Sequence, residues 1–138
     1  MTSQICPVSC ALDIVGDKWT LLVVRDLIFR CKRCFGNLQN SPEKIAIDIF
    51  SDRLGKLKAA GMVLRQPHPD PGCTVVYAVT EKCLDLVPII MELIRWGAKH
   101  VSGSNAHENL VQRFEQDPVE FMAQIKLSLR KENEANKE

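Results

Sequence analysis

The chain has 138 residues, of which 46% are hydrophobic and 25% charged, and its formal net charge is +1. This length and balance predict a single globular, soluble domain rather than two domains. No apolar run reaches the roughly 18 residues that span a bilayer, and the first residues lack a secretory signal. We therefore expect a cytoplasmic protein with no membrane partner.

Two helices are predicted near the N-terminus. The first covers residues 7–15 and is broken at Gly16. Asp17 can cap the second helix, because its carboxylate can accept hydrogen bonds from the first backbone N–H groups. The side chains expected on the buried face of the second helix are Trp19, Leu22, Val23 and Leu27.

A helix-turn-helix pattern follows. A short helix is expected over Phe35–Gln39, then a turn at Ser41–Pro42 and a longer helix that ends near Ala60. In the longer helix, Ile49 or Phe50, Leu54 and Leu57 recur at helical spacing and are expected to face inward. Gly61 is expected to end the helix in a left-handed conformation. Gly55 costs about 1 kcal/mol against alanine, which packing is expected to offset.

The next segment predicts a β-hairpin. Residues 62–66 and 74–79 alternate as two antiparallel strands, and the Pro-rich stretch from Pro67 to Cys73 joins them. A helix-turn-helix followed by a hairpin is the pattern of a winged helix-turn-helix domain. The predicted fold class is therefore mainly α with a small β-hairpin wing (α+β).

The C-terminal part is expected to be helical. One helix should run from Thr80 to Gly97 with a slight bend at Pro88, and a linker should follow at residues 102–106. Asp117 and Pro118 start a last helix, with Phe121, Ile125 and Leu129 in steps of four. We assign residues 1–101 to the winged domain with its dimerisation helices and 102–138 to a C-terminal helical extension. These terminal helices offer more apolar surface than one small core can bury, which predicts a homodimer.

Positive charge is concentrated on the helix-turn-helix. Residues 30–66 carry eight basic and three acidic groups, a net charge of +5, whereas residues 105–138 carry five basic and seven acidic groups, a net charge of −2. A phosphate-binding face would produce this asymmetry. Surface helices with spare lysines would produce it as well.

Six short motifs in a fixed order resemble the HxlR-type regulators, which are bacterial winged helix-turn-helix transcription factors related to the MarR group. The motifs are Cys6–Pro7, Leu12–Trp19, Phe35–Leu38, Ser51–Leu54, Tyr77–Thr80 and Trp96–Gly97. The resemblance covers about residues 5–100. It implies a homodimer on a palindromic operator in double-stranded DNA, with the recognition helix in the major groove, the wing at the backbone or minor groove, and terminal helices at the dimer interface.

The resemblance makes Ala46–Ala60 the recognition helix. Its outward positions would be Ile47, Asp48, Ser51, Asp52 and Lys56. Arg53 could bind guanine or phosphate with two N–H groups, or it could pair with Asp48 or Asp52 on its own helix. Lys32, Arg33 and Lys44 are interpreted as phosphate contacts. In the wing only His68 could contribute positive charge.

Several positions depart from the family pattern. Many relatives carry basic or amide side chains where Ile47 and Asp48 stand, and Cys34 replaces an arginine. Two aspartates facing DNA repel phosphates unless one accepts a hydrogen bond from a cytosine amino group. A second interpretation is therefore a winged-helix module with weak DNA affinity that acts through a protein or small-ligand partner.

Six cysteines allow three interpretations. Structural disulfides do not fit a reducing compartment. A zinc site would need the pairs Cys6/Cys10 and Cys31/Cys34 to meet, and nothing in the sequence brings them together. The family resemblance implies that Cys6, in Cys6–Pro7, senses oxidants or electrophiles. Cys10 could be its resolving partner or, like Cys73 and Cys83, a small buried side chain.

An enzyme is the rival class of function. The three histidines, His68, His100 and His107, lie in a loop or near helix ends. No nucleophile, zinc-protease or phosphate-loop motif accompanies them. We therefore expect no catalysis and no cofactor.

Overall fold

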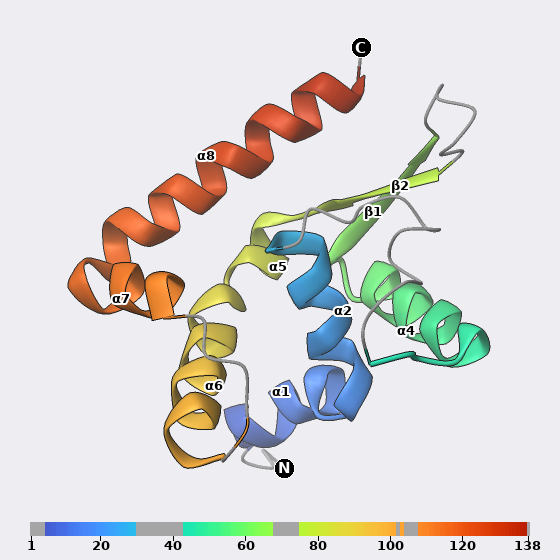
Figure 1. The fold of residues 1–138 in the computed structure, drawn as a ribbon. Helices are drawn as coiled ribbons and strands as arrows, with labels where there is room; N and C mark the ends of the chain where they lie inside the picture. Colours follow the sequence, from blue (N-terminus) through green and yellow to red (C-terminus); the bar gives the residue numbers. More distant parts are fainter. Residues whose placement is uncertain (1–4, 30–42, 68–74, 102, 104–107, 138) are drawn as a thin grey trace. The chain divides into compact units, whose positions relative to one another are not determined.

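The computed structural model describes residues 5–29, 43–67, 75–101, 103 and 108–137 (Figure 1). The helices and strands belong to two compact units, residues 1–80 and residues 81–138. The predicted short helix at 35–39 and the wing loop after Pro67 lie outside the described residues, as does most of the linker at 102–106. Each unit is described separately below.

The first unit begins with helices α1 (Pro7–Val15) and α2 (Lys18–Ile28), at the predicted positions. Pro7 suits the first turn of α1, where its missing N–H leaves no intrahelical bond unmade. The Asp17 carboxylate caps α2 by accepting hydrogen bonds from the backbone N–H groups of Trp19 and Thr20, at 3.0 and 3.2 Å. Of the predicted buried face, Val23 and Leu27 are buried, whereas Trp19 and Leu22 are half-buried.

Helix α4 (Ile47–Ala59) packs against α2 (Figure 1). It buries Phe50, Leu54 and Leu57, as the helical spacing predicted, and Gly61 ends the segment with a φ of 75°. Gly55 is exposed and a Cβ built there would meet no atom within 4 Å, so the packing that offsets its cost comes from the buried side chains of α4 and not from Gly55 itself. Gly55 therefore weakens α4 without a packing benefit in this structure.

Strands β1 (Val63–Pro67) and β2 (Val75–Val79) pair antiparallel, with Val63 opposite Val79. Thr80 closes the base of this hairpin, where its hydroxyl donates to the carbonyl oxygens of Gly61 at 2.7 Å and Met62 at 3.1 Å. Simple alternation does not hold in β2, because residues 76–79 are all buried. A continuous apolar run of this kind marks a strand that is covered on both faces.

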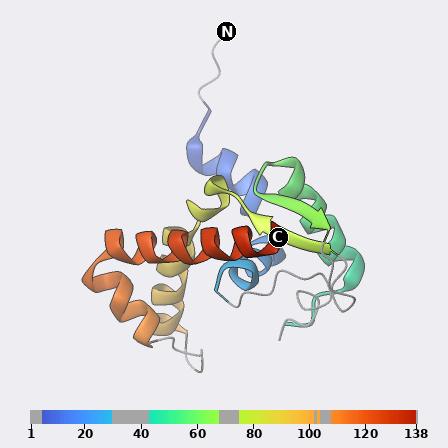
Figure 2. The same cartoon turned by 90° about the horizontal axis from the view of Figure 1, so that it is seen from above.

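The second unit contains α5 (Glu81–Leu84), α6 (Val87–His100), α7 (Glu108–Gln116) and α8 (Pro118–Lys137). The predicted single helix with a bend at Pro88 is wrong, because α5 ends at Leu84 and a second helix starts at Val87. Proline lacks the N–H that an interior position needs, so it sits in the first turn of α6 instead. Helix α8 is long and straight (Figure 2) and starts at the predicted cap, where Asp117 accepts from the Glu120 N–H at 3.1 Å.

Candidate nucleic-acid interface

The outer face of α4 carries the five outward residues predicted from the sequence. Phe50, Leu54 and Leu57 are buried at 1–2% exposure. The residues Ile47, Asp48, Ser51, Asp52 and Lys56 are all exposed. Helix α4 therefore buries three large apolar side chains on one side and presents a mainly polar face on the other, with Ile47 as its exposed large apolar residue.

Arg53 lies at the edge of that face and is held by two carboxylates. Its Nε donates to Asp17 Oδ2 at 2.7 Å, and its Nη1 donates to Asp52. The hydrogen bond to Asp17 is the main reason that the pKa of Arg53 is raised. The intramolecular partners are thus Asp52, as one sequence interpretation proposed, and Asp17, which lies 36 positions away in the chain.

Asp17 gains a second role from this contact, in addition to capping α2. Burial alone would raise the pKa of its carboxyl group, but hydrogen bonds from Thr20, Arg53 and the Trp19 backbone outweigh that effect. The pKa of Asp17 is lowered to about 2 as a result. The carboxylate therefore stays charged throughout the physiological pH range.

The two aspartates of the outer face have different surroundings. Asp52 contacts Arg53 and also Lys56 Nζ, at 3.5 Å, so two cations offset its charge. No ion pair to Asp48 occurs within the part of the chain that the structure describes. Asp48 lies in the first turn of α4, where the helix dipole favours a negative charge.

Other basic residues surround α4. Lys44 is exposed just before the helix and has a φ of 53°, in the left-handed region that side chains other than glycine rarely adopt. Lys58 and Arg65 are exposed as well and were not singled out from the sequence. Both residues belong to the basic stretch at residues 30–66, and this was the feature of the sequence that could have identified them as candidate phosphate contacts. The predicted contacts Lys32, Arg33 and His68 lie outside the described residues.

An ion cluster that the sequence analysis missed joins α2 to the segment before α4. Arg25 donates from Nη1 and Nη2 to the two carboxylate oxygens of Glu43, at 2.6 and 2.9 Å. Arg25 also donates to Asp26 Oδ1 from Nε at 3.0 Å and from Nη2 at 2.8 Å. Asp26 is only 1% exposed. A charged pair inside the apolar run of α2 was the signal that could have revealed this cluster.

The described cysteines divide into two kinds. Cys6 precedes the first turn of α1 and is exposed, and Cys10, one turn later, is exposed as well. The interpretation of Cys10 as a buried side chain is therefore wrong in the single chain. Cys83 is buried as expected, and burial raises the pKa of its thiol to about 12, which leaves it unreactive as a nucleophile. Cys31, Cys34 and Cys73 lie outside the described residues.

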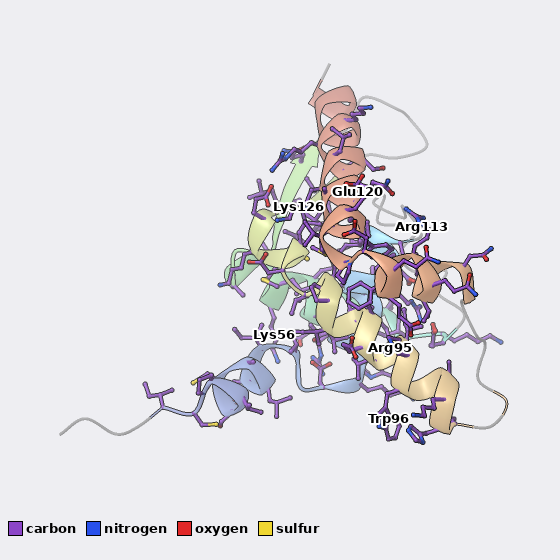
Figure 3. All side chains as sticks on the ribbon, turned by 90° about the vertical axis from the view of Figure 1, so that its left-hand side faces the viewer. Lys56, Arg95, Trp96, Arg113, Glu120 and Lys126 are labelled. Atoms are coloured by element: carbon purple, nitrogen blue, oxygen red, sulfur yellow. The ribbon has the colours of Figure 1, made fainter. Side chains whose placement is uncertain are left out.

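The second unit carries an apolar groove formed by α6 and α7. Ile89, Leu93 and Trp96 recur along one face of α6 and are 46–62% exposed. Polar residues at the edge include Arg95, whose Nη1 lies 2.9 Å from Glu92 and whose Nε lies 2.8 Å from Glu115 (Figure 3). An exposed apolar face with a charged rim is typical of an interaction surface.

The C-terminal extension forms a folded helical pair. Phe114 of α7 and Phe121 of α8 pack edge to face with ring centroids 5.6 Å apart. Arg113 lies over the Phe121 ring and donates to Gln124 at 2.6 Å (Figure 3). Arg130 of α8 binds Glu81 of α5 at 2.8 Å. These contacts fix α7 and α8 within the second unit.

Two further properties concern only the described residues. No helix among them is long and apolar enough to cross a membrane. No group of three or more histidine, cysteine, aspartate or glutamate side chains in the same ranges could hold a metal ion.

Comparisons with known proteins agree on one family. The family model described as HxlR-like helix-turn-helix matches residues 14–105. The uncharacterized HTH-type transcriptional regulator BH0655 of Halalkalibacterium halodurans is 31% identical over 97 residues, which cover 70% of this chain and 86% of the relative.

Two solved structures are also similar. PA1607, a proposed transcription factor, is 32% identical with a TM-score of 0.65, and the match covers 74% of this chain and 70% of PA1607. The redox regulator HypR in its oxidized form is 28% identical with a TM-score of 0.59, and the match covers 69% of this chain and 97% of HypR.

Proposed function

Because the chain belongs to the HxlR-like helix-turn-helix family of transcriptional regulators, we propose that it binds a palindromic DNA operator as a homodimer. Helix α4 is the recognition helix and enters the major groove. In a two-fold symmetric dimer, two such helices read half-sites about 34 Å apart, which makes the operator palindromic. Transcription is then controlled by occupancy of that operator.

The observation that carries this proposal is the outer face of α4. Phe50, Leu54 and Leu57 are buried on one side while Asp48, Ser51, Asp52 and Lys56 are exposed on the other, so the helix can enter a groove without losing its packing. Lys56 and Lys44 are placed to contact phosphates, which fix register but carry no sequence information. Ile47 suits a thymine methyl group, and Asp48 can accept from a cytosine amino group. Lys32, Arg33 and His68 are proposed as further backbone contacts.

The test is to measure binding of the protein to the intergenic DNA upstream of its own gene, and to random DNA, across a series of salt concentrations. With about six phosphate contacts, affinity should fall about 10³-fold between about 50 and 200 mM salt, because bound counterions are released. The operator should be bound more tightly than random DNA at every salt concentration. Binding that is insensitive to salt, or no stronger for the operator, would contradict the proposal.

The homodimer is proposed from the exposed face of α6. Ile89, Leu93 and Trp96 form one apolar stripe that the single chain leaves in water, and Val8 and Leu12 of α1, with Ile5 just before the helix, form a second exposed apolar patch. A second copy of the chain would cover such stripes and bring two recognition helices into a symmetric arrangement. Light scattering should give the mass of two chains at micromolar concentration, and a monomer would contradict this.

Regulation by thiol chemistry at Cys6 is proposed as well. Cys6 is exposed at the start of α1 next to an apolar stripe, so a modification there would alter a surface that the dimer is proposed to use. The similarity to the redox regulator HypR supports this assignment. A thiol oxidant should weaken operator binding by the wild type and not by Cys6→Ser. The matched variant Cys10→Ser, treated with the same oxidant, shows whether the second exposed thiol contributes to the loss of operator binding.

A winged-helix module that acts mainly through a protein or small ligand is the second candidate. The groove between α6 and α7 and the acidic Asp48 on the recognition helix favour it. The salt series separates the two functions, since only DNA binding releases counterions from phosphates.

A further inference from the structure

The recognition helix is fixed on α2 by apolar packing and by directional contacts. Phe50, Leu54 and Leu57 are buried on the side of α4 that packs against α2. Hydrophobic burial is not directional, so it fixes the distance between two helices better than the angle between them. Charge-assisted hydrogen bonds have a preferred geometry and can fix that angle.

Two such contacts come from the two ends of α2. Asp17, at the start of α2, binds Arg53 in the middle of α4 at 2.7 Å. Arg25, in the last turn of α2, binds Glu43 through two hydrogen bonds. Glu43 stands three residues before Ala46, the N-cap of α4. A helix held at one point can pivot, whereas attachment at two separated points fixes its direction.

The hydrogen bonds of Arg53 limit what it can do on DNA. A bidentate contact to guanine needs two neighbouring N–H groups of the guanidinium that point the same way. In Arg53, Nε is used by Asp17 and Nη1 by Asp52, and the side chain is only 21% exposed. Two of the five guanidinium N–H groups are thus engaged, and the others belong to a side chain that two carboxylates hold and that is largely covered. Lys56 is more exposed, at 69%, and its Nζ lies 3.5 Å from Asp52, farther than either carboxylate contact of Arg53.

We propose that Asp17 and Arg53 form a clamp that positions α4 for sequence readout, so that Arg53 is a positioning residue and not a base-reading one. The clamp sets the angle at which Ile47, Asp48 and Ser51 meet the base pairs. A change in this angle displaces all three side chains together, so readout at several base pairs depends on it. This inference rests on the proposed function, since it presumes sequence-specific DNA binding.

The test uses the full chain and an operator selected from a random double-stranded library by binding to the wild type. Asp17→Asn removes the charge but retains an amide oxygen that can cap α2, and Arg53→Lys keeps the charge but loses the guanidinium geometry. Three quantities are measured. The first is the specificity ratio, which is the affinity for the operator divided by the affinity for random DNA. The second is the salt slope, which is the fall in the logarithm of affinity with the logarithm of salt concentration, and the third is the affinity for operators with each base pair changed in turn. Thermal melting of every variant reports on folding.

Each single variant should lower the specificity ratio about tenfold, and the double variant should lower it no further, because both substitutions remove one shared contact. Preference should weaken at several base pairs at once, while the salt slope and the affinity for random DNA stay unchanged. Lys56→Ala is the contact control, and it should reduce the salt slope by about one and weaken binding to all sequences alike. Glu81→Gln breaks an ion pair in the second unit and should change none of these quantities.

Three outcomes would overturn the clamp while leaving the proposed function intact. Loss of preference at a single G·C pair in Arg53→Lys, with Asp17→Asn like the wild type, would make Arg53 a base-reading residue. Arg53→Ala, a further variant that removes the positive charge, would show a lower salt slope if Arg53 were a phosphate contact. Lower melting temperatures with an unchanged specificity ratio would leave the pair a role in folding only. A wild type that selects no sequence from the library would overturn the proposed function itself, and the clamp with it.

Discussion

Helices α4 and α6 have similar lengths, 13 and 14 residues, but present opposite kinds of surface. Helix α4 exposes acids, a serine and lysines, and buries Phe50, Leu54 and Leu57. Helix α6 buries Val87, Ile90 and Met91 but also exposes a second apolar stripe with Trp96 at 62% exposure. A helix with a polar outer face is favourably solvated by water, whereas a helix that is apolar on two faces needs another surface to cover its second apolar face.

The difference between the exposed surfaces of α4 and α6 suits the two helices to different kinds of contact. In the proposed function the polar face of α4 meets the polar groove of DNA, where its side chains exchange hydrogen bonds to water for hydrogen bonds to bases and phosphates. The apolar stripe of α6 gains stability only when another apolar surface covers it, as in a homodimer. Substitutions on the two helices should therefore affect different measurements.

The largest effect is expected from Leu54→Ala on the buried face of α4. Loss of this side chain, which is 2% exposed, should lower the free energy of unfolding by about 2–5 kcal/mol, because a cavity replaces buried contacts. Leu93→Ala makes the same change on the exposed stripe of α6 and should cost under about 0.5 kcal/mol in dilute monomer. Urea unfolding at low protein concentration measures both changes in the free energy of unfolding. Equal losses in the two variants would contradict the difference between a buried face of α4 and an exposed stripe of α6.

The next effect concerns assembly. Trp96→Glu places a charge in the α6 stripe and should weaken the dimer by about 30-fold or more, since buried tryptophans are frequent hot spots of interfaces. Ile47→Ser is the matched control, because it alters the exposed large apolar residue of α4. Analytical ultracentrifugation over a concentration series should show a shifted dissociation constant for the first variant and none for the second. An unchanged dimer in Trp96→Glu would place the interface elsewhere.

Acid should weaken the link between α2 and α4. The pKa of Asp17 is about 2 in the folded chain, against about 3.9 for an unfolded aspartate. A depressed carboxyl pKa adds stability above the unfolded pKa, and this stability is lost as pH falls from about 4 to about 2. The wild type should therefore be more stable than Asp17→Asn at about pH 5, and the difference should shrink toward pH 2. A constant difference in chemical unfolding across this window would show that the charge of Asp17 is unimportant.

The smallest effect is expected from Gly55→Ala on the exposed side of α4. Alanine should raise the free energy of unfolding by about 0.5–1 kcal/mol, since a Cβ meets no neighbour there and glycine is a poor helix former. Gly97→Ala in α6, where a Cβ also meets nothing, is the control for the general helix effect. A melting temperature that rises for Gly97→Ala but falls for Gly55→Ala would point to strain in α4.

Local signals were enough for much of the fold. Helix α1, the Asp17 cap, the buried side of α4, the Gly61 terminus and the Asp117–Pro118 start all depend on residues within a few positions of one another. The error at Pro88 arose because one apolar stripe continues through residues 84–94, and periodicity alone does not show where a helix is interrupted. Proline chemistry favours a helix start at that position as strongly as a bend.

The sequence by itself determined the winged helix-turn-helix class and the exposed face of α4, because capping, turns and helical periodicity act over short distances. Only the tertiary structure decided which charges meet. Arg53 was expected to bind either DNA or an acidic residue of its own helix. It binds Asp52 of that helix and also Asp17, which caps another helix. Arg25 and Glu43, 18 positions apart, meet for the same reason. Contacts between distant residues depend on how helices pack, and no local pattern in one sequence encodes that.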